Sequence, residues 1–157
     1  MRYFSTRDKK LNFSFTEIFS RGLAPDGGLF IPSELKKYSS SELKSLQNLS
    51  YTDLATEIIS SFCSPDLDKQ KLKILISNAY NNFFTKEVVK IKKIGDIHLL
   101  ELYHGPTLAF KDIAMQVIGN LYDELNIADK KKVNIVVATS GDTGSAAISA
   151  LNEKKKY

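Results

Sequence analysis

The segment from Val133 to Ala150 constrains the fold more than any other part of this 157-residue chain. It begins with an apolar run, Val133 to Ala138, of the kind that forms a strand buried on both faces of a parallel sheet. A glycine-bearing turn follows over residues 139–144, and a helix of small residues is predicted over 145–150. Together with a helix expected before the run, this order of elements predicts an α/β fold.

The residues before this unit predict a hairpin and a long helix. Two short runs, residues 88–92 and 97–102, read as strands joined across Gly95-Asp96. A helix is expected from Phe110 to Leu125 because apolar residues recur there at helical spacing. Residues 126–132 read as a polar connector. Since a parallel sheet needs further strand–helix units, we expect the α/β part to be incomplete within this chain.

The N-terminal part reads as a series of short helices. Capping boxes begin two of them, Ser14 with Glu17 and Ser39 with Glu42, and Ser50 begins a third. A fourth helix is expected around residues 72–79. We therefore predict a mostly helical N-terminal domain over residues 1–82 and the beginning of an α/β domain over residues 83–157.

Composition excludes several classes of function. The net charge of +4 is scattered along the chain and is not interleaved with aromatic residues, so nucleic-acid binding is not expected. No apolar run reaches the roughly 18 residues that a membrane span requires. The single cysteine, Cys63, fits a core position and a reducing cytoplasm. The two histidines, His98 and His104, lack the spacing of metal ligands, so no metal is expected.

The first candidate site surrounds Lys111, in the sequence His-Gly-Pro-Thr-Leu-Ala-Phe-Lys-Asp from His104 to Asp112. The positive end of a helix dipole, together with apolar neighbours, favours the neutral form of a lysine amine. A neutral amine can condense with a carbonyl, so this position suits Schiff-base chemistry. The alternative is a surface lysine beside a helix N-terminus, with Asp112 as an ordinary first-turn acid. The residues alone leave both open.

The second candidate site is the turn Ser140-Gly141-Asp142-Thr143-Gly144. Backbone N–H groups at a helix start, with nearby hydroxyls, can bind an anion such as a phosphate or a carboxylate. Asp142 favours the smaller anion, because its own charge opposes a phosphate. The alternative is a simple connector in which Ser140 or Asp142 caps the helix.

These two motifs resemble those of the threonine synthase family. His104 to Asp112 is similar to that family's cofactor-lysine motif, and Ala138 to Ala147 is similar to its substrate and cofactor loop. A third similarity joins Ser5-Thr6-Arg7 with the segment from Gly22 to Pro32. The three motifs occur in the family's order and span nearly the whole chain.

The resemblance implies a pyridoxal 5'-phosphate enzyme of fold type II, the tryptophan-synthase-β-like fold. It implies that Lys111 carries the cofactor and moves protons between substrate carbons. Ser140, Gly141 and Thr143 would bind the substrate carboxylate, and Asp142 would face the cofactor. His104 and Phe110 would flank the pocket. The implied reaction converts O-phospho-L-homoserine and water into L-threonine and phosphate.

The resemblance also implies that the site is incomplete, because the family's later glycine-rich loop for the cofactor phosphate has no counterpart here. We therefore expect the isolated chain to be inactive. Two alternatives remain: a phospho-amino-acid lyase of the same fold, or a non-catalytic domain that retains the fold. The oligomeric state is left open.

Overall fold

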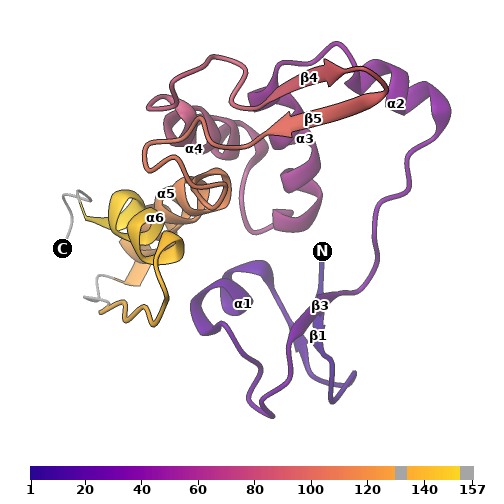
Figure 1. Cartoon of the computed structure of the whole chain (residues 1–157). Helices are drawn as coiled ribbons and strands as arrows, with labels where there is room; N and C mark the ends of the chain where they lie inside the picture. Colours follow the sequence, from indigo (N-terminus) through magenta and orange to yellow (C-terminus); the bar gives the residue numbers. More distant parts are fainter. Residues whose placement is uncertain (130–133, 153–157) are drawn as a thin grey trace. The chain divides into compact units, whose positions relative to one another are not determined.

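The computed structural model describes residues 1–129 and 134–152. The chain forms two compact parts, Met1–Lys73 and Ile74–Tyr157, and the boundary between them falls inside helix α4 (Lys69–Tyr80). Figure 1 shows the order of the elements along the chain. The division into domains 1–82 and 83–157 stays a prediction.

The first part contains a small sheet and three complete helices. Strands β1 (Tyr3–Ser5), β2 (Asn12–Phe13) and β3 (Phe30–Pro32) form an antiparallel sheet in the order β2-β1-β3. The helices are α1 (Phe15–Arg21), α2 (Ser40–Leu46) and α3 (Tyr51–Cys63). The sheet was not predicted, because strands of two or three residues are too short to show a periodic pattern.

The predicted helix starts of the first part are confirmed. Ser14 and Ser39 each accept a hydrogen bond from the backbone of the glutamate three residues later, and each glutamate bonds back. Gly22 ends α1 with a φ of 73°, a left-handed conformation that glycine adopts without strain. Cys63 is fully buried, and burial raises the pKa of its thiol to about 12. A thiol so placed is a core residue, as predicted.

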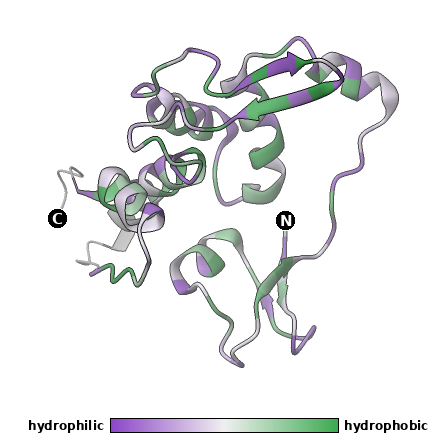
Figure 2. Cartoon of the chain, in the orientation of Figure 1, coloured by the Kyte–Doolittle hydropathy of each residue, from purple (hydrophilic) through white to green (hydrophobic). Residues whose placement is uncertain are grey.

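The second part begins with the end of α4 and a two-stranded hairpin. Strands β4 (Lys90–Ile94) and β5 (Ile97–Glu101) pair antiparallel, with Ile94 opposite Ile97 across the turn at Gly95. The predicted hairpin is therefore confirmed. Both strands mix hydrophobic and hydrophilic residues (Figure 2).

Helices α5 (Asp112–Asp129) and α6 (Asp142–Leu151) pack against each other in the second part. The contact is close because small residues face it: Ala146, Ala147 and Ala150 of α6 are buried. A Cβ added to Gly119 of α5 would overlap the carbonyl oxygen of Ala150. Gln116 Nε2 donates a hydrogen bond of 3.2 Å to Ser149 Oγ across the same contact. The helix predicted over 145–150 is confirmed, but it begins at Asp142, inside the predicted turn. The helix predicted from Phe110 to Leu125 begins at Asp112 and continues to Asp129, so the connector predicted from residue 126 begins later.

The strand predicted over residues 133–138 is wrong for the part that the structure describes. Val133 lies outside the described residues, and residues 134–139 have no regular secondary structure. Their side chains are exposed, Val136 to 93%. A central strand is stable only when neighbouring strands bond its N–H and C=O groups. Neither strand of the hairpin pairs with this segment.

Within the described ranges, no helix has both the length and the apolar character needed to cross a membrane.

Candidate functional site

Lys111 lies directly before helix α5, at the end of the loop that starts at His104. Its carbonyl oxygen accepts the backbone N–H of Met115 at 2.9 Å, which is the first hydrogen bond of the helix. Its Nζ atom lies 4.3 Å from the centre of the Phe110 ring. Among the described residues Lys111 forms no salt bridge, so no carboxylate is paired with its amine.

A hollow of about 350 Å³ lies beside this lysine. Its walls are almost entirely apolar, and Lys111 supplies the one charged side chain among them. The lining residues are Leu102, Phe110, Lys111, Ile113, Ala114 and Met115. Phe110 is 57% exposed although it is a large aromatic residue. An exposed aromatic ring beside an unpaired amine and an apolar hollow is a surface suited to a planar ligand.

The loop before Lys111 is held by Asp112, whose side chain is fully buried. The two carboxylate oxygens of Asp112 accept hydrogen bonds from the backbone N–H of Thr107, at 2.8 Å, and from its hydroxyl, at 2.7 Å. The sequence had offered Asp112 only as an ordinary first-turn acid. Its burial and its two bonds to Thr107 could not be read from a local pattern, because both depend on how the loop folds back.

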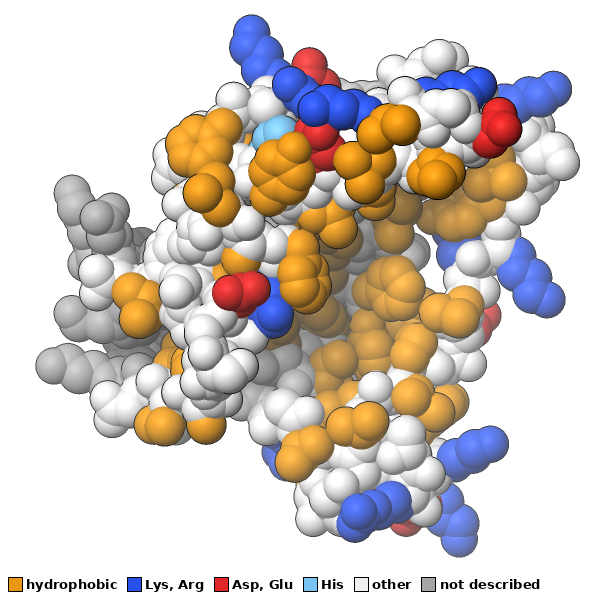
Figure 3. Space-filling view, in the orientation of Figure 1, with side chains coloured by type: hydrophobic (Ala, Val, Ile, Leu, Met, Phe, Trp, Pro, Cys, Tyr) orange, Lys and Arg blue, Asp and Glu red, His pale blue; other side chains and the backbone are white. Residues whose placement is uncertain are grey.

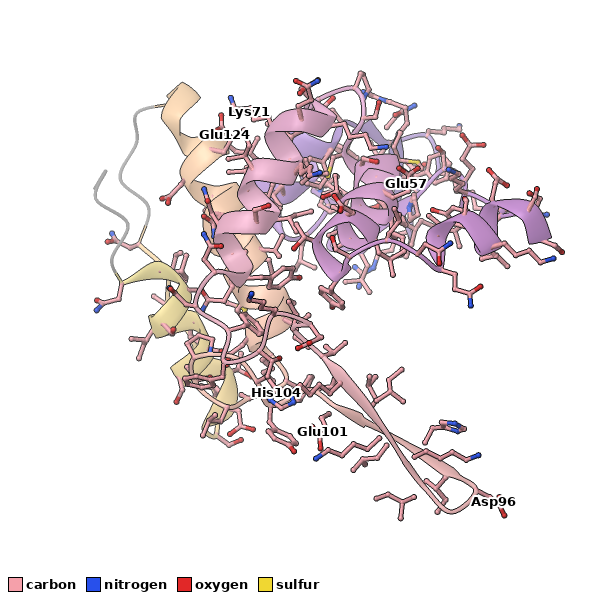
Figure 4. The ribbon with its side chains drawn as sticks, turned by 90° about the horizontal axis from the view of Figure 1, so that it is seen from above. Glu57, Lys71, Asp96, Glu101, His104 and Glu124 are labelled. Atoms are coloured by element: carbon pink, nitrogen blue, oxygen red, sulfur yellow. The ribbon has the colours of Figure 1, made fainter. Side chains whose placement is uncertain are left out.

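His104 is tied to a second buried carboxylate, that of Glu101 at the end of β5. The Nε2 atom of His104 lies 3.0 Å from Glu101 Oε2, and Lys92 Nζ lies 2.5 Å from Glu101 Oε1. The hydrogen bond from Lys92, with others from Tyr103 and His104, lowers the pKa of Glu101 to about 2. Figure 4 shows Glu101 and His104 together at one end of the hairpin, with Asp96 at the other.

The second candidate site lies at the N-terminus of α6. Gly141 is the N-cap residue, and no side chain bonds the free N–H groups of the first turn. The alternative reading, in which Ser140 or Asp142 caps the helix, is therefore wrong. Ser140, Gly141 and Asp142 are exposed, and Thr143 is half-buried. Uncapped N–H groups leave this helix end open to an anion.

The two candidate sites belong to neighbouring helices of one part, α5 and α6. Among the described residues, Lys111 forms no hydrogen bond or ion pair with residues 140–143. His104 is likewise joined to Glu101 rather than to Lys111. The structure therefore places the predicted residues at the starts of two helices that pack together, without direct bonds between them.

Comparison with known proteins identifies relatives of the whole chain. The family described as "Threonine synthase N terminus" matches residues 2–80. The threonine synthase of Saccharomyces cerevisiae is 42% identical over 172 residues, covering 98% of this chain and 33% of that protein. The threonine synthase-like 2 protein of Xenopus laevis is 38% identical over 157 residues, covering 99% of this chain and 33% of that protein.

A solved structure matches equally fully. The crystal structure of a PLP-bound threonine synthase from Brucella melitensis superposes with a TM-score of 0.93 at 34% identity, covering 99% of this chain and 34% of that one. The mixed α/β fold of this chain is thus shared with a third of that enzyme. The chain spans about a third of the length of the relatives that it matches.

Proposed function

The chain belongs to the threonine synthase family, and from this membership we propose that it is the N-terminal part of a pyridoxal-phosphate enzyme in which Lys111 holds the cofactor. One observation carries the proposal. Within the described residues, an amine without a salt bridge stands at the wall of an apolar hollow, beside an exposed aromatic ring. Condensation with an aldehyde requires an amine that is accessible as a nucleophile, and this position leaves the Lys111 amine accessible.

Lys111 would act both as the attachment point of the cofactor and as a proton carrier. When bound, pyridoxal phosphate supplies an electron sink for the charge that develops on substrate carbons. The Lys111 amine, once released, would take a proton from one substrate carbon and return it to another. Phe110, whose ring lies beside Nζ, would form one wall of this site.

The start of α6 would bind the substrate. Its uncapped N–H groups, with the hydroxyls of Ser140 and Thr143, suit the carboxylate of an amino acid. Gly141 would allow the ligand to approach the backbone, since nothing lies within 4 Å of the place where a Cβ would stand. By the resemblance to the family, Asp142 would face the cofactor. By the same resemblance, His104 would flank the pocket.

The proposed reaction is that of the family: O-phospho-L-homoserine and water give L-threonine and phosphate. The proposed setting is a fold type II enzyme in the cytoplasm. Its α/β domain would start near residue 83.

We propose that the 157 residues alone do not catalyse this reaction. The relatives are about three times as long, and the residues that bind the cofactor phosphate would lie in the other two thirds. A cofactor held only by Lys111 and two helix starts would lose its main anionic contact and bind weakly.

The test combines this chain with the missing part of a relative. We would co-express it with the remaining two thirds of the Saccharomyces cerevisiae threonine synthase, add pyridoxal phosphate and O-phosphohomoserine, and measure threonine. We expect no product from the 157-residue chain alone, product from the pair, and none from the pair carrying Lys111→Ala. Turnover by the chain alone, or undiminished turnover with K111A, would contradict the proposal.

A second candidate is a phospho-amino-acid lyase of the same fold. It stays open because the Ser-Gly-Asp-Thr-Gly turn over residues 140–144 does not by itself fix the substrate. The same co-expression assay separates the two, if 2-oxobutyrate is measured beside threonine. A pair that binds pyridoxal phosphate but releases neither product would instead favour a non-catalytic domain.

A further inference from the structure

The carboxylate of Asp112 uses both of its oxygens on a single residue of the preceding loop. Oδ2 accepts the Thr107 backbone N–H and Oδ1 accepts the Thr107 hydroxyl. Hydrogen bonds to a charged acceptor are about twice as strong as neutral ones. Because Asp112 is fully buried, water does not compete for these bonds. The loop is therefore fastened to the first residue of α5 at two points.

Gly105 lets the loop backbone approach the Asp112 side chain closely enough for these two hydrogen bonds to form. A Cβ on Gly105 would overlap the Asp112 side chain, with Asp112 Oδ2 only 2.6 Å away. Only a glycine lets the loop backbone lie this close to the carboxylate. Two tight turns then fill the space between them, with Leu108 N bonded to Gly105 O at 3.1 Å and Asp112 N bonded to Ala109 O at 3.0 Å.

The fastened loop carries backbone strain at Leu108, whose φ is 62°. A left-handed conformation costs a leucine roughly 1–2 kcal/mol, so it persists only when surrounding contacts impose it. Leu108 is 62% exposed, so its own side chain gains little from the arrangement. The two bonds between Asp112 and Thr107 join the backbone hydrogen bonds of Leu108 and Asp112 in holding the strained turn in place.

We propose that Asp112 is the positioning residue for Lys111. Lys111 lies between the strained turn and the helix, directly bonded to Asp112 in the chain, and its carbonyl already belongs to the helix. Fixing Thr107 against Asp112 therefore fixes the backbone that carries the amine and aims the side chain at the hollow. The inference rests on the proposed function and adds to it a residue that would not touch cofactor or substrate.

An ordinary first-turn acid would behave differently. Asp112 in that role would stabilise α5 by its charge alone, and Thr107 would not matter. A positioning role requires the hydroxyl of Thr107 as well as the carboxylate, and it requires that the reactivity of Lys111 change when either is lost. Thr107→Ser, which keeps the hydroxyl, should then behave like the unaltered chain.

The experiment compares Asp112→Ala, Thr107→Val and Thr107→Ser in this chain, co-expressed with the remaining two thirds of the Saccharomyces cerevisiae threonine synthase so that the proposed contacts to the cofactor phosphate are present. Asp96→Asn, at the exposed hairpin turn, is the matched control. The first readout is hydrogen exchange of the Thr107 amide. The second is the ratio of label on Lys111 to label on the exposed Lys44 after treatment with pyridoxal phosphate and borohydride, mapped by peptide mass spectrometry.

We expect amide exchange to rise about tenfold or more in D112A, since a hydrogen bond to a charged group is worth roughly that factor or more. The label ratio should fall several-fold in D112A, less in T107V, and not at all in T107S or D96N. Because D112A could unfold the chain, T107V, which keeps the carboxylate, also decides the question.

Two results separate the inference from the proposed function. A label ratio that stays unchanged in D112A and T107V, while the unaltered chain labels Lys111 preferentially, overturns the positioning role alone. An unaltered co-expressed pair that labels Lys111 no more than Lys44 contradicts the proposed function, and the inference falls with it.

Discussion

Leu108 shows how a single residue can reveal a site before its chemistry is known. Its positive φ places a bulky side chain in a conformation that glycine tolerates better, within three residues of the candidate lysine. Strained residues persist where surrounding bonds over-determine the backbone, and such places are often functional.

Relieving this strain should stabilise the chain. We expect Leu108→Gly to raise the free energy of unfolding by up to about 1 kcal/mol, because the roughly 1–2 kcal/mol of strain exceeds the entropic cost of a glycine. Urea denaturation followed by circular dichroism measures it. Leu108→Ala keeps the strain and should show no gain. A destabilised L108G would mean that the turn is not strained.

Glu101 makes the stability of the second part depend on pH in the acidic range. Its pKa falls from an ordinary 4.5 to about 2, mainly through the hydrogen bond from Lys92. A depressed carboxylate pKa stabilises the folded chain above the unfolded pKa, and this contribution is lost as the pH falls through the folded pKa. The loss should therefore occur between about pH 4.5 and pH 2.

The measurement is a series of denaturation curves over that pH range, with Glu101→Gln as the comparison. We expect the unaltered chain to lose its stability advantage over E101Q progressively as the pH is lowered from 4.5 to 2. A constant difference between the two chains would show that the carboxylate has an unshifted pKa.

At the scale of single residues, the sequence predicted where a residue lies relative to a helix better than it predicted that residue's hydrogen-bond and ion-pair partners. Lys111 and Gly141 stand at the helix starts where their neighbours had placed them. The partners of Asp112 and Glu101 were missed, because each carboxylate is satisfied by residues of a loop or of a neighbouring strand. Such pairs form only after the chain has folded back on itself.

At the scale of elements, helices α5 and α6 approach each other closely because glycine and alanine line their contact. Gly119 lies against the backbone of Ala150, where an added Cβ would also meet the Ala150 Cβ at 3.3 Å. The buried alanines of α6 make the remaining contacts. Close backbone approach keeps the two candidate helix starts on one packed unit.

The sign of the stability change caused by Gly119→Ala tests this close approach. In a free helix this change would stabilise by about 1 kcal/mol. Here the overlap with a backbone carbonyl should instead destabilise the chain, by about 1–3 kcal/mol as for other overpacked sites. Thermal denaturation of the variant decides between them. A stabilised G119A would mean that α5 and α6 do not pack closely.

Elements with their own local signals were predicted well. The capping boxes of α1 and α2 and the hairpin turn at Gly95 are confirmed, because the bonds that form them join residues within three or four positions. Residues 134–138, the described part of the predicted run, do not form a strand because the hydrogen-bond partners of a central strand must come from other strands. The small N-terminal sheet was missed for the related reason that its strands are too short to carry a pattern.

At the scale of the whole molecule, the hairpin of β4 and β5 exposes a cluster of large apolar side chains. Ile91, Ile94, Ile97, Leu99 and Leu100 are between 46% and 70% exposed. Figure 3 shows hydrophobic and lysine side chains side by side on this region. A two-stranded hairpin with apolar residues on both faces is marginally stable alone and prone to pair through its free edges.

We therefore predict that the isolated chain associates as its concentration rises. Ile97→Lys, at a position 70% exposed, should raise the monomeric fraction because it places a charge beside the free edge. Ile74→Lys, at an equally apolar position of α4 that is 60% exposed, is the control and should change it less. Sedimentation velocity measures both. Equal effects of the two changes would show that the hairpin is not the associating surface.

The sequence by itself determined the helices, the hairpin, the buried cysteine and the two motifs that identify the family. Each of these depends on residues close together in the chain or on residue types in a fixed order. The tertiary structure decided that Asp112 and Glu101 are buried and bonded, that Leu108 is strained, and that residues 134–139 stay open. The physical reason is the same throughout: burial and hydrogen bonding between distant segments depend on which surfaces meet, and a local pattern does not specify that.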